Sequence, residues 1–106
     1  IDYNLFNNIL LKAQNMVKGW DGEFYFVYLP SIKSVSNNTE YSHKKNILNI
    51  VEKLNIPIID FNNVLDSHKD KMSVFALRNN IHYNAEGYKL ISETILKTLT
   101  KDDVIP

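Results

Sequence analysis

The feature that most constrains this sequence is an uninterrupted apolar and aromatic run over residues 24–29, bounded by Gly22 and Pro30. A short run of this kind with turn-forming residues at both ends predicts a β-strand. Because no polar residue alternates with the apolar ones, we expect the strand to be buried on both faces, as in a parallel sheet. Such a strand needs helices to cover it.

Helical periodicity precedes this run. Over residues 2–18 apolar side chains recur at three- and four-residue spacing, which predicts an amphipathic helix. We expect Asp2 to cap its first turn and Gly19 to close its last turn in the left-handed conformation. The apolar stripe comprises Leu5, Phe6, Ile9, Leu10, Ala13, Met16 and Val17.

A second strand follows after a loop and a helix. Residues 31–39 are polar and turn-rich and are expected to form a loop, with Ser31 as an ordinary loop serine. A helix over residues 40–54 should then lead to a strand over residues 56–61, where Pro57 lies near the start and its missing N–H is tolerated. This order predicts a βαβ unit with a right-handed crossover. The helix is expected to bury Ile47, Leu48, Val51 and Leu54.

The remainder reads as a short helical piece over residues 63–68, an irregular stretch to residue 80, and a final helix. Asn84 is expected to be the N-cap of that helix. Gly87, in its first turn, is expected to pack closely against a neighbouring element. The helix should bury Tyr88, Ile91, Ile95, Leu96 and Leu99.

The fold class is therefore α/β, with residues 1–106 forming a single unit. Two strands make a poor sheet by themselves, so we expect the chain to be part of a larger α/β sheet. The absence of an initiator methionine at Ile1 fits a processed product or a fragment of something longer. An open sheet edge predicts self-association.

Composition excludes several function classes. Twelve Lys and Arg residues balance twelve Asp and Glu residues, which argues against a nucleic-acid partner. The absence of cysteine excludes a thiol nucleophile and a Cys-ligated zinc site, and leaves the compartment open. No apolar run reaches the ~18 residues of a membrane span. No glycine-rich nucleotide motif is present.

Candidate chemistry lies at the carboxyl ends of the strands, where open parallel sheets form their sites. There the sequence carries His82-Tyr83-Asn84-Ala85-Glu86-Gly87-Tyr88. A histidine just ahead of a helix N-terminus at this edge is a reasonable general base. The block resembles the last sequence block of the SGNH (GDSL-type) hydrolases, in which Asp-x-x-His is followed by Asn and by a Gly-Tyr or Gly-His pair that opens the C-terminal helix. The order of strands and helices over roughly residues 20–100 is also similar to that family.

The resemblance implies a three-layer α/β/α, flavodoxin-like fold, of which this chain is the C-terminal part. It also implies a serine esterase, lipase or O-acyltransferase mechanism in which His82 is the general base, without metal or organic cofactor. The substrate would be a small ester or an ester-linked acyl group on a glycan. The family's Gly-Asp-Ser, Gly and Gly-x-Asn-Asp blocks are absent here and would lie N-terminal to the matching region. The isolated chain is therefore expected to be inactive.

The acidic partner of the histidine is missing from its place in the motif. The family's Asp lies three residues before His, where this sequence has Asn79, and the shorter spacing falls on Asn80, also an amide. An amide orients an imidazole without stabilising its charge, and Asp→Asn in one serine protease costs about 10⁴ in kcat. Three alternatives stay open: Asn79 serves, the site is weakened or dead, or another carboxylate serves, namely Asp60, Asp66 or Asp70.

Two other hypotheses remain. The chain is a non-catalytic SGNH-like domain that binds carbohydrate or protein, or a structural α/β domain whose His82 merely precedes a helix. His43 and His68 have no partners at metal-ligand spacing, and Asp66, His68 and Asp70 are better explained as solvated charges.

Overall fold

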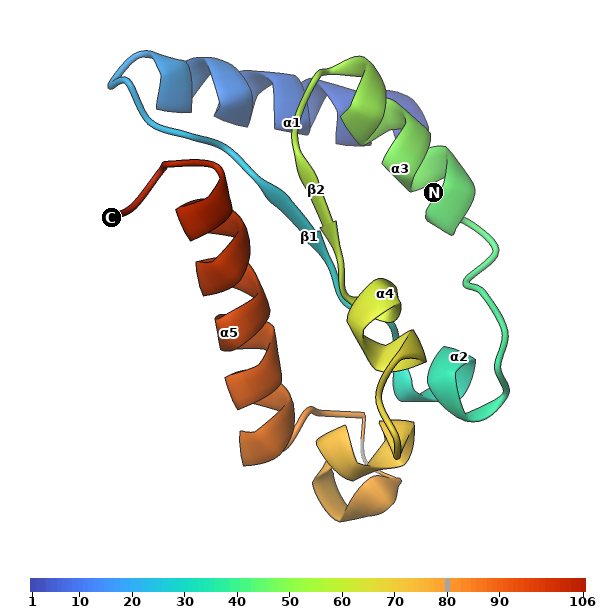
Figure 1. Cartoon of the computed structure of the whole chain (residues 1–106). Coiled ribbons are helices and arrows are strands. Elements are labelled where there is room, and N and C mark those ends of the chain that lie inside the picture. The colour runs from blue at the N-terminus through green and yellow to red at the C-terminus, as the bar shows by residue number, and fades with distance from the viewer. Residues whose placement is uncertain (80) are drawn as a thin grey trace. The chain divides into compact units, whose positions relative to one another are not determined.

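The computed structural model describes residues 1–79 and 81–106, which combine helices with a small sheet (Figure 1). β1 and β2 are neighbours in a two-stranded parallel sheet, which confirms the α/β expectation at this coarse level. The backbone N–H of Phe26 donates to the carbonyl of Pro57 at 2.9 Å. In chain order the elements are α1 (Tyr3–Lys18), β1 (Phe26–Tyr28), α2 (Ile32–Ser36), α3 (Lys44–Lys53), β2 (Ile58–Asp60), α4 (Phe61–Asp66), the 3₁₀ turns η1 (Lys71–Val74) and η2 (Ala76–Arg78), and α5 (Ala85–Lys101).

The chain divides into two compact units, and the division falls within both strands. The first unit comprises Ile1–Val27 and Ser42–Ile58. The second unit comprises Tyr28–Tyr41 and Ile59–Pro106. Each unit has its own hydrophobic core. Within residues 1–79 and 81–106, no helix has the length and apolar character needed to cross a membrane.

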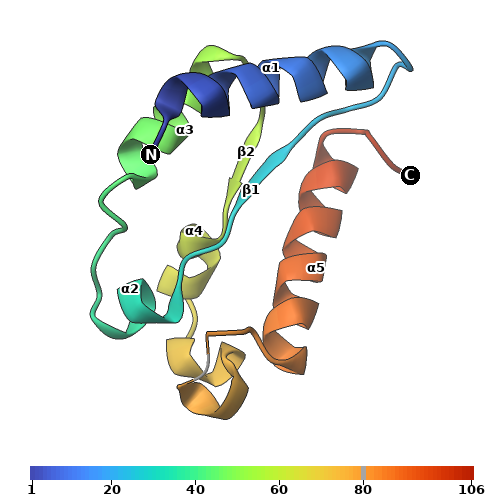
Figure 2. The same ribbon diagram turned by 180° about the vertical axis from the view of Figure 1, so that it is seen from behind.

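The first unit is built on α1 and α3, which lie side by side (Figures 1 and 2). Leu10 of α1 and Val51 of α3 are buried together with Ile56, which follows α3. Phe6 meets Phe26 of β1 edge to face, with ring centroids 6.1 Å apart. In this unit α1 therefore packs against the first residue of β1.

α1 begins and ends close to the predicted residues. The side chain of Asp2 accepts a hydrogen bond from the backbone N–H of Leu5 at 2.9 Å, which confirms the predicted N-cap. The prediction for Gly19 was wrong, because its φ of −62° is right-handed. The chain turns instead through Asp21, at φ 57°. Aspartate tolerates the left-handed region better than most residues, so the turn does not need glycine.

Both strands are shorter than predicted. β1 has three residues, all half-buried, so burial on both faces was not observed. A strand in a two-stranded sheet has only one neighbour, and its side chains therefore keep part of their surface open. β2 ends at Asp60 because Asp60 caps α4, and Phe61, predicted to be in the strand, starts that helix.

A helix occupies the region predicted to be a loop. α2 forms because Ser31 acts as its N-cap, with Oγ accepting from the N–H of Ser34 at 3.2 Å. Ile32 and Val35 of this helix pack on the core of the second unit. The polar composition of residues 31–39 gave no sign of this stabilising contact. α3, in contrast, begins at Lys44 rather than at Glu40.

The second unit has its core between α4, η1 and α5. Its buried residues are Phe61, Leu65, Val74, Phe75 and Ile91. Ile91 was predicted to be buried, and Ile95 packs against the same cluster. Tyr88 and Leu96 were also predicted to be buried, but they are 54% and 57% exposed. The apolar stripe of α5 is thus wider than the surface that α4 and η1 cover.

Candidate functional site

Asn84 joins the start of α5 to the preceding irregular segment. Its Oδ1 accepts from the N–H of Gly87 at 2.8 Å, which confirms the predicted N-cap. Its Nδ2 donates to the carbonyls of Ser73 at 2.6 Å and Phe75 at 3.2 Å. Its own N–H donates to the carbonyl of Val74 at 2.9 Å. One side chain therefore serves both as a helix cap and as the anchor of η1.

Gly87 is required by close packing, as predicted. A Cβ at this position would lie 2.4 Å from the backbone oxygen of Val74 and 3.0 Å from the ring of Tyr83. Real Cβ atoms do not approach backbone oxygens so closely, and a backbone atom cannot swing aside as a flexible side chain can. Only glycine lets η1 approach the first turn of α5.

Tyr83 ties the histidine block to the segment that follows β1. Its hydroxyl donates to the carbonyl of Pro30 at 2.6 Å. Its ring stacks on Phe75 at a centroid distance of 4.7 Å and meets Phe61 edge to face at 5.9 Å. Burial, with smaller contributions from the phenols of Tyr28 and Tyr88, raises the pKa of Tyr83. Because Pro30 follows β1, this bond places the block at the carboxyl end of that strand, where α/β proteins form their sites.

His82 is held through its main chain and has an exposed side chain. Its carbonyl accepts from the N–H of Ala76 at 3.0 Å, next to a β-bridge between Phe75 and Tyr83. The residue thus precedes two fixed neighbours, Tyr83 and Asn84, which both use their side chains for packing and hydrogen bonds. His82 is therefore one of three exposed titratable groups in the block, with Glu86 and Tyr88, and it is the one that directly precedes the anchored residues.

Asn79, which the resemblance aligns with a catalytic Asp, follows η2 as its C-cap. Its φ of −149° is outside the helical region, its N–H donates to the carbonyl of Ala76 at 3.3 Å, and its side chain is exposed. Asn79 and His82 are three positions apart in the sequence. Asn80, the position for the shorter spacing, lies outside the described residues.

Arg78 and Asp70 form an ion pair that the sequence reasoning missed. Arg78 donates from both terminal nitrogens to the two carboxylate oxygens of Asp70, at 2.6 and 3.1 Å. This hydrogen bonding holds the pKa of Asp70 below its usual range and raises the pKa of Arg78. The two residues are eight positions apart and are joined by the 3₁₀ turns η1 and η2, so no α-helical or strand periodicity predicts the pair.

Backbone strain accompanies this pair. Leu77 and Arg78 have φ values of 53° and 60°, and Leu77 is 87% exposed. A non-glycine residue in the left-handed region costs roughly 1–2 kcal/mol. The bidentate bond to Asp70 and the Ala76–His82 backbone bond hold the strained turn in place.

The other candidate carboxylates have structural partners as well. Asp66 lies 3.2 Å from the ammonium of Lys71. Asp60 accepts from the N–H of Asn62 at 3.0 Å as the N-cap of α4. Asp60, Asp66 and Asp70 each therefore hold a local turn. Among the described residues there is no group of three or more His, Asp or Glu side chains arranged to hold a metal ion.

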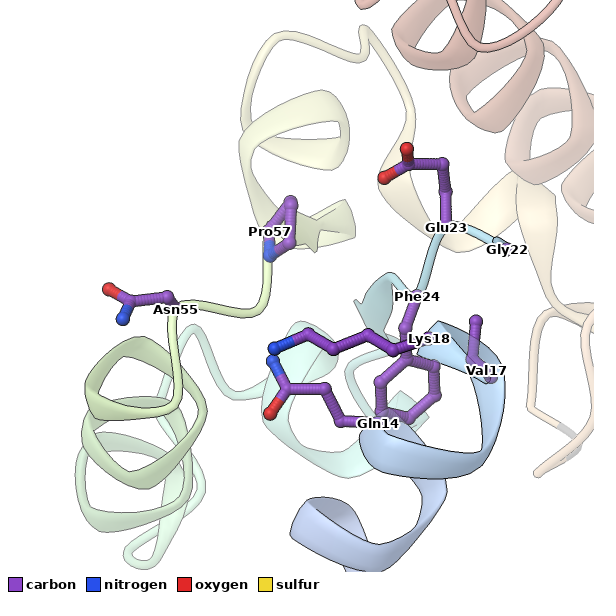
Figure 3. Close-up of a pocket in the computed structure, with 8 residues that line it drawn as sticks. All are labelled: Gln14, Val17, Lys18, Gly22, Glu23, Phe24, Asn55 and Pro57. Carbon is purple, nitrogen blue, oxygen red and sulfur yellow. The ribbon is translucent and has the colours of Figure 1, made fainter. Parts of the chain in front are cut away.

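The first unit contains a pocket of about 320 Å³ with a mixed polar and apolar lining, shown in Figure 3. Gln14 and Lys18 of α1 line it together with Glu23, and Phe24 contributes its ring. Gln14 is nearly buried, and its Nε2 donates to the carbonyl of Leu54 at 2.8 Å. Phe24 and Pro57, which also lines the pocket, precede the two strands. The pocket contains none of the predicted site residues.

No protein-family model, curated protein or solved structure matches this chain.

Proposed function

We propose that this chain supplies the histidine block of an SGNH-type serine ester hydrolase or O-acyltransferase, with His82 as the general base. The observation that carries the proposal is that the residues after His82 fix the block to the rest of the fold while the side chain of His82 is exposed. Tyr83, Asn84 and Gly87 anchor it to Pro30 and η1, and His82 keeps an exposed imidazole beyond the carboxyl end of β1. The wider fold proposed with it is a three-layer, flavodoxin-like α/β/α domain of which this chain is the C-terminal part.

The chemistry follows from the acid–base role of imidazole. His82 takes the proton of a serine hydroxyl as that oxygen attacks the carbonyl carbon of an ester. It then gives the proton to the oxygen of the alcohol as the ester C–O bond breaks. The alcohol departs and the acyl group stays on the serine oxygen as an acyl-enzyme. Water or an acceptor alcohol, deprotonated in turn by His82, resolves this intermediate. The serine and the oxyanion donors are supplied by residues outside these 106, because no Gly-Asp-Ser block is present.

Asn79 has the position of the orienting residue. An amide oxygen accepts a hydrogen bond from a neutral imidazole and fixes its tautomer, but it adds little electrostatic stabilisation of the imidazolium. The three alternative carboxylates are held by Asn62, Lys71 and Arg78. We therefore assign the orienting role to Asn79, and we expect a lower catalytic rate than a site with Asp at this position would have.

The substrate class is an uncharged acyl ester, such as an acetyl group on a glycan or a small ester. The chain has no net charge at pH 7, so its overall field does not select a strongly charged substrate. Hydrolysis and acyl transfer use the same histidine and differ only in the second nucleophile.

The amide at residue 79 also favours a second candidate function. A domain that has lost its catalytic carboxylate and still folds in the same way would bind a carbohydrate or a protein without turning it over. This candidate retains the anchoring roles of Tyr83, Asn84 and Gly87 and gives His82 no proton-transfer role.

The test is labelling of the whole polypeptide, including the sequence encoded ahead of Ile1, with a fluorophosphonate that reacts with activated serines. We expect labelling and hydrolysis of an aryl acetate, both reduced at least a hundredfold in His82→Gln. The matched control is His43→Gln, which removes a histidine of the first unit and should retain both activities. Equal labelling of wild type and His82→Gln would overturn the proposal, and absence of labelling in the wild type would favour the binding domain.

Asn79→Asp sharpens the assignment of the orienting residue. A carboxylate at this position would stabilise the imidazolium, so the variant should hydrolyse the aryl acetate at least tenfold faster than wild type. The upper limit of this gain is the loss of about 10⁴ in kcat that Asp→Asn causes in one serine protease. Asn79→Ala should be slower than wild type. An unchanged rate in both variants would remove residue 79 from the mechanism.

A further inference from the structure

The pocket in Figure 3 is one end of a longer surface track in the first unit. Asn55, which lines this pocket, also lines a second hollow of about 540 Å³. The second hollow shares Asn49 and Lys53 with a third hollow of about 290 Å³. The three hollows, hereafter the track, therefore adjoin one another along α3 and the turn that follows it. The third hollow is completed by Tyr3, Asn46 and Ile50.

Carboxamide side chains line every part of the track. In order along it they are Gln14, Asn55, Asn49 and Asn46. An amide donates hydrogen bonds from its nitrogen and accepts them at its oxygen, and a hydroxyl group also does both. Each of these amides can therefore pair with a hydroxyl group through either of its ends. The lining favours a ligand rich in hydroxyl groups.

Gln14 is held in place by the protein itself. The residue is 8% exposed, and its Nε2 donates to the carbonyl of Leu54 at 2.8 Å. This bond fixes the carboxamide and leaves Oε1 to accept a hydrogen bond from a ligand. Lys18, four residues later on α1, extends in the same direction and adds N–H donors (Figure 3). The wall of the first hollow is thus preorganised, which lowers the entropic cost of binding.

The charges along the track are balanced. The described lining residues include two lysines and two glutamates, namely Lys18, Lys53, Glu23 and Glu52. A site that selects an ion is lined mainly by charges of the opposite sign, so the track does not select one. An apolar ligand would remove water from the amides and charges without replacing their hydrogen bonds. An uncharged polar ligand fits both conditions.

An exposed tryptophan lies beside the first hollow. Trp20 is 65% exposed, although tryptophan is highly buried on average. A Cβ at Gly22, which lines the hollow, would lie 2.6 Å from Nε1 of Trp20. Glycine therefore lets the indole lie against the wall of the hollow, where Phe24 contributes a second ring. The flat faces of these rings offer apolar surface to the C–H groups of a sugar ring.

We propose that the track binds an uncharged oligosaccharide, with Trp20 and Phe24 against one sugar ring and the four amides hydrogen-bonded to hydroxyl groups along the chain. Between Asn46 and Lys53, α3 alone rises roughly 10 Å, so the track extends beyond a single ring. The proposal assigns carbohydrate binding to side chains of the first unit. The track shares no residue with the block around His82, so the proposal holds whether or not His82 is a general base.

A peptide fits the track less well than a sugar chain. Peptide-binding sites commonly offer a sheet edge, an apolar groove or a cluster of like charges. The track is instead lined by side chains of α1, α3 and the turns that follow them, with charges of both signs. Its hydrogen-bonding groups are spread along its length, as the hydroxyl groups of a sugar chain are.

The test is a nuclear magnetic resonance titration of the whole polypeptide, including the sequence encoded ahead of Ile1. The probes are four uncharged hexasaccharides, of α-linked glucose, β-linked glucose, N-acetylglucosamine and mannose, with hexagalacturonate and hexaglycine as the charged and peptide comparisons. The indole N–H of Trp20 and the side-chain amide of Asn55 are identified as the signals lost in Trp20→Phe and Asn55→Gly. We expect at least one uncharged sugar to shift both signals to saturation, with a Kd of about 10 µM to 1 mM.

Variants locate the binding in the track. Trp20→Ala should weaken it at least tenfold, and Trp20→Phe should weaken it less because a phenyl ring keeps part of the contact. Asn55→Gly should weaken it at least threefold without disturbing the turn, because Asn55 has a φ of 57° that glycine adopts freely. The matched controls are Asn38→Gly, at φ 51°, and Tyr41→Ala, an exposed aromatic position. Both lie in the second unit and should bind like wild type.

Three results would each overturn the proposal: no shift with any of the four sugars, equally large shifts with hexagalacturonate or hexaglycine, or unchanged affinity in both Trp20→Ala and Asn55→Gly. Thermal unfolding of every variant separates loss of binding from loss of folding, and Trp20→Phe and Asn55→Gly decide the result if Trp20→Ala unfolds early. Fluorophosphonate labelling needs no sugar and is read separately. Its absence would count against the proposed function and leave the binding result intact.

Discussion

The hydroxyl of Tyr83 donates a hydrogen bond of 2.6 Å to the backbone carbonyl of Pro30, 53 residues earlier in the chain. Pro30 is fully buried and follows β1, so the bond joins the histidine block to the end of that strand. This long-range contact and the stacking of Tyr83 on Phe75 hold in place the residue that directly follows His82.

Tyr83→Phe should lower the free energy of unfolding by about 1–3 kcal/mol at pH 7, because a buried carbonyl loses its donor. The pKa of Tyr83 is raised in the folded state, so its contribution is complete below the unfolded pKa of about 10 and is lost as the pH rises further. Urea unfolding of both proteins at pH 7 and at pH 11 checks this. The difference between them should shrink at pH 11, and a constant difference would contradict it.

Asn84→Ala should cost about 2 kcal/mol or more, since the helix loses its cap and two carbonyls lose a donor. Asp usually replaces Asn at an N-cap with little effect. Here Asn84→Asp should be nearly as damaging as Asn84→Ala, because a carboxylate oxygen would face the carbonyl of Ser73. Thermal unfolding gives the comparison, with Asp2→Asn at the cap of α1 as the control that stays within about 0.5 kcal/mol.

Gly87→Ala should destabilise the protein even though alanine is the better helix former. The helix propensity gain is about 1 kcal/mol, and overpacking against the oxygen of Val74 costs roughly 1–3 kcal/mol. Denaturant unfolding should show a lower midpoint. Ser92→Ala, at an exposed position of the same helix, should leave the midpoint nearly unchanged. A stabilised Gly87→Ala would mean that η1 does not contact α5 as described.

Asp70→Asn tests the ion pair with Arg78. The pKa of Asp70 is lowered in the folded state, so the stabilisation is present above the unfolded pKa of about 3.9 and disappears as the pH falls through the lower folded value. Wild type should therefore have the higher Tm at pH 6, and the two proteins should converge near pH 3. Because both groups are exposed, 0.5 M salt at pH 6 should reduce the difference. A difference that persists at pH 3 would assign the effect to something other than this charge.

Several features of the site could be predicted from the sequence because their causes are local. Asn84 was predicted as an N-cap from its place before a periodic apolar segment, and Gly87 as a close-packing residue from its place in the first turn. His82 was singled out by the same block. The bidentate partner of Asp70 could not be predicted, because an irregular turn with two left-handed residues brings Arg78 to it.

The sequence by itself determined where α1 and α5 begin, because capping and periodicity act within a few neighbouring residues. It also indicated that the run over residues 24–29 contains a strand that pairs with a second, parallel strand. Only the tertiary structure decided which sides of those helices are covered. Leu96 of α5 and Ile9 of α1 are apolar yet exposed. Ser31 starts a helix because Ile32 and Val35 pack on the core of the second unit. Burial depends on partners that are distant in sequence, and local patterns do not contain them.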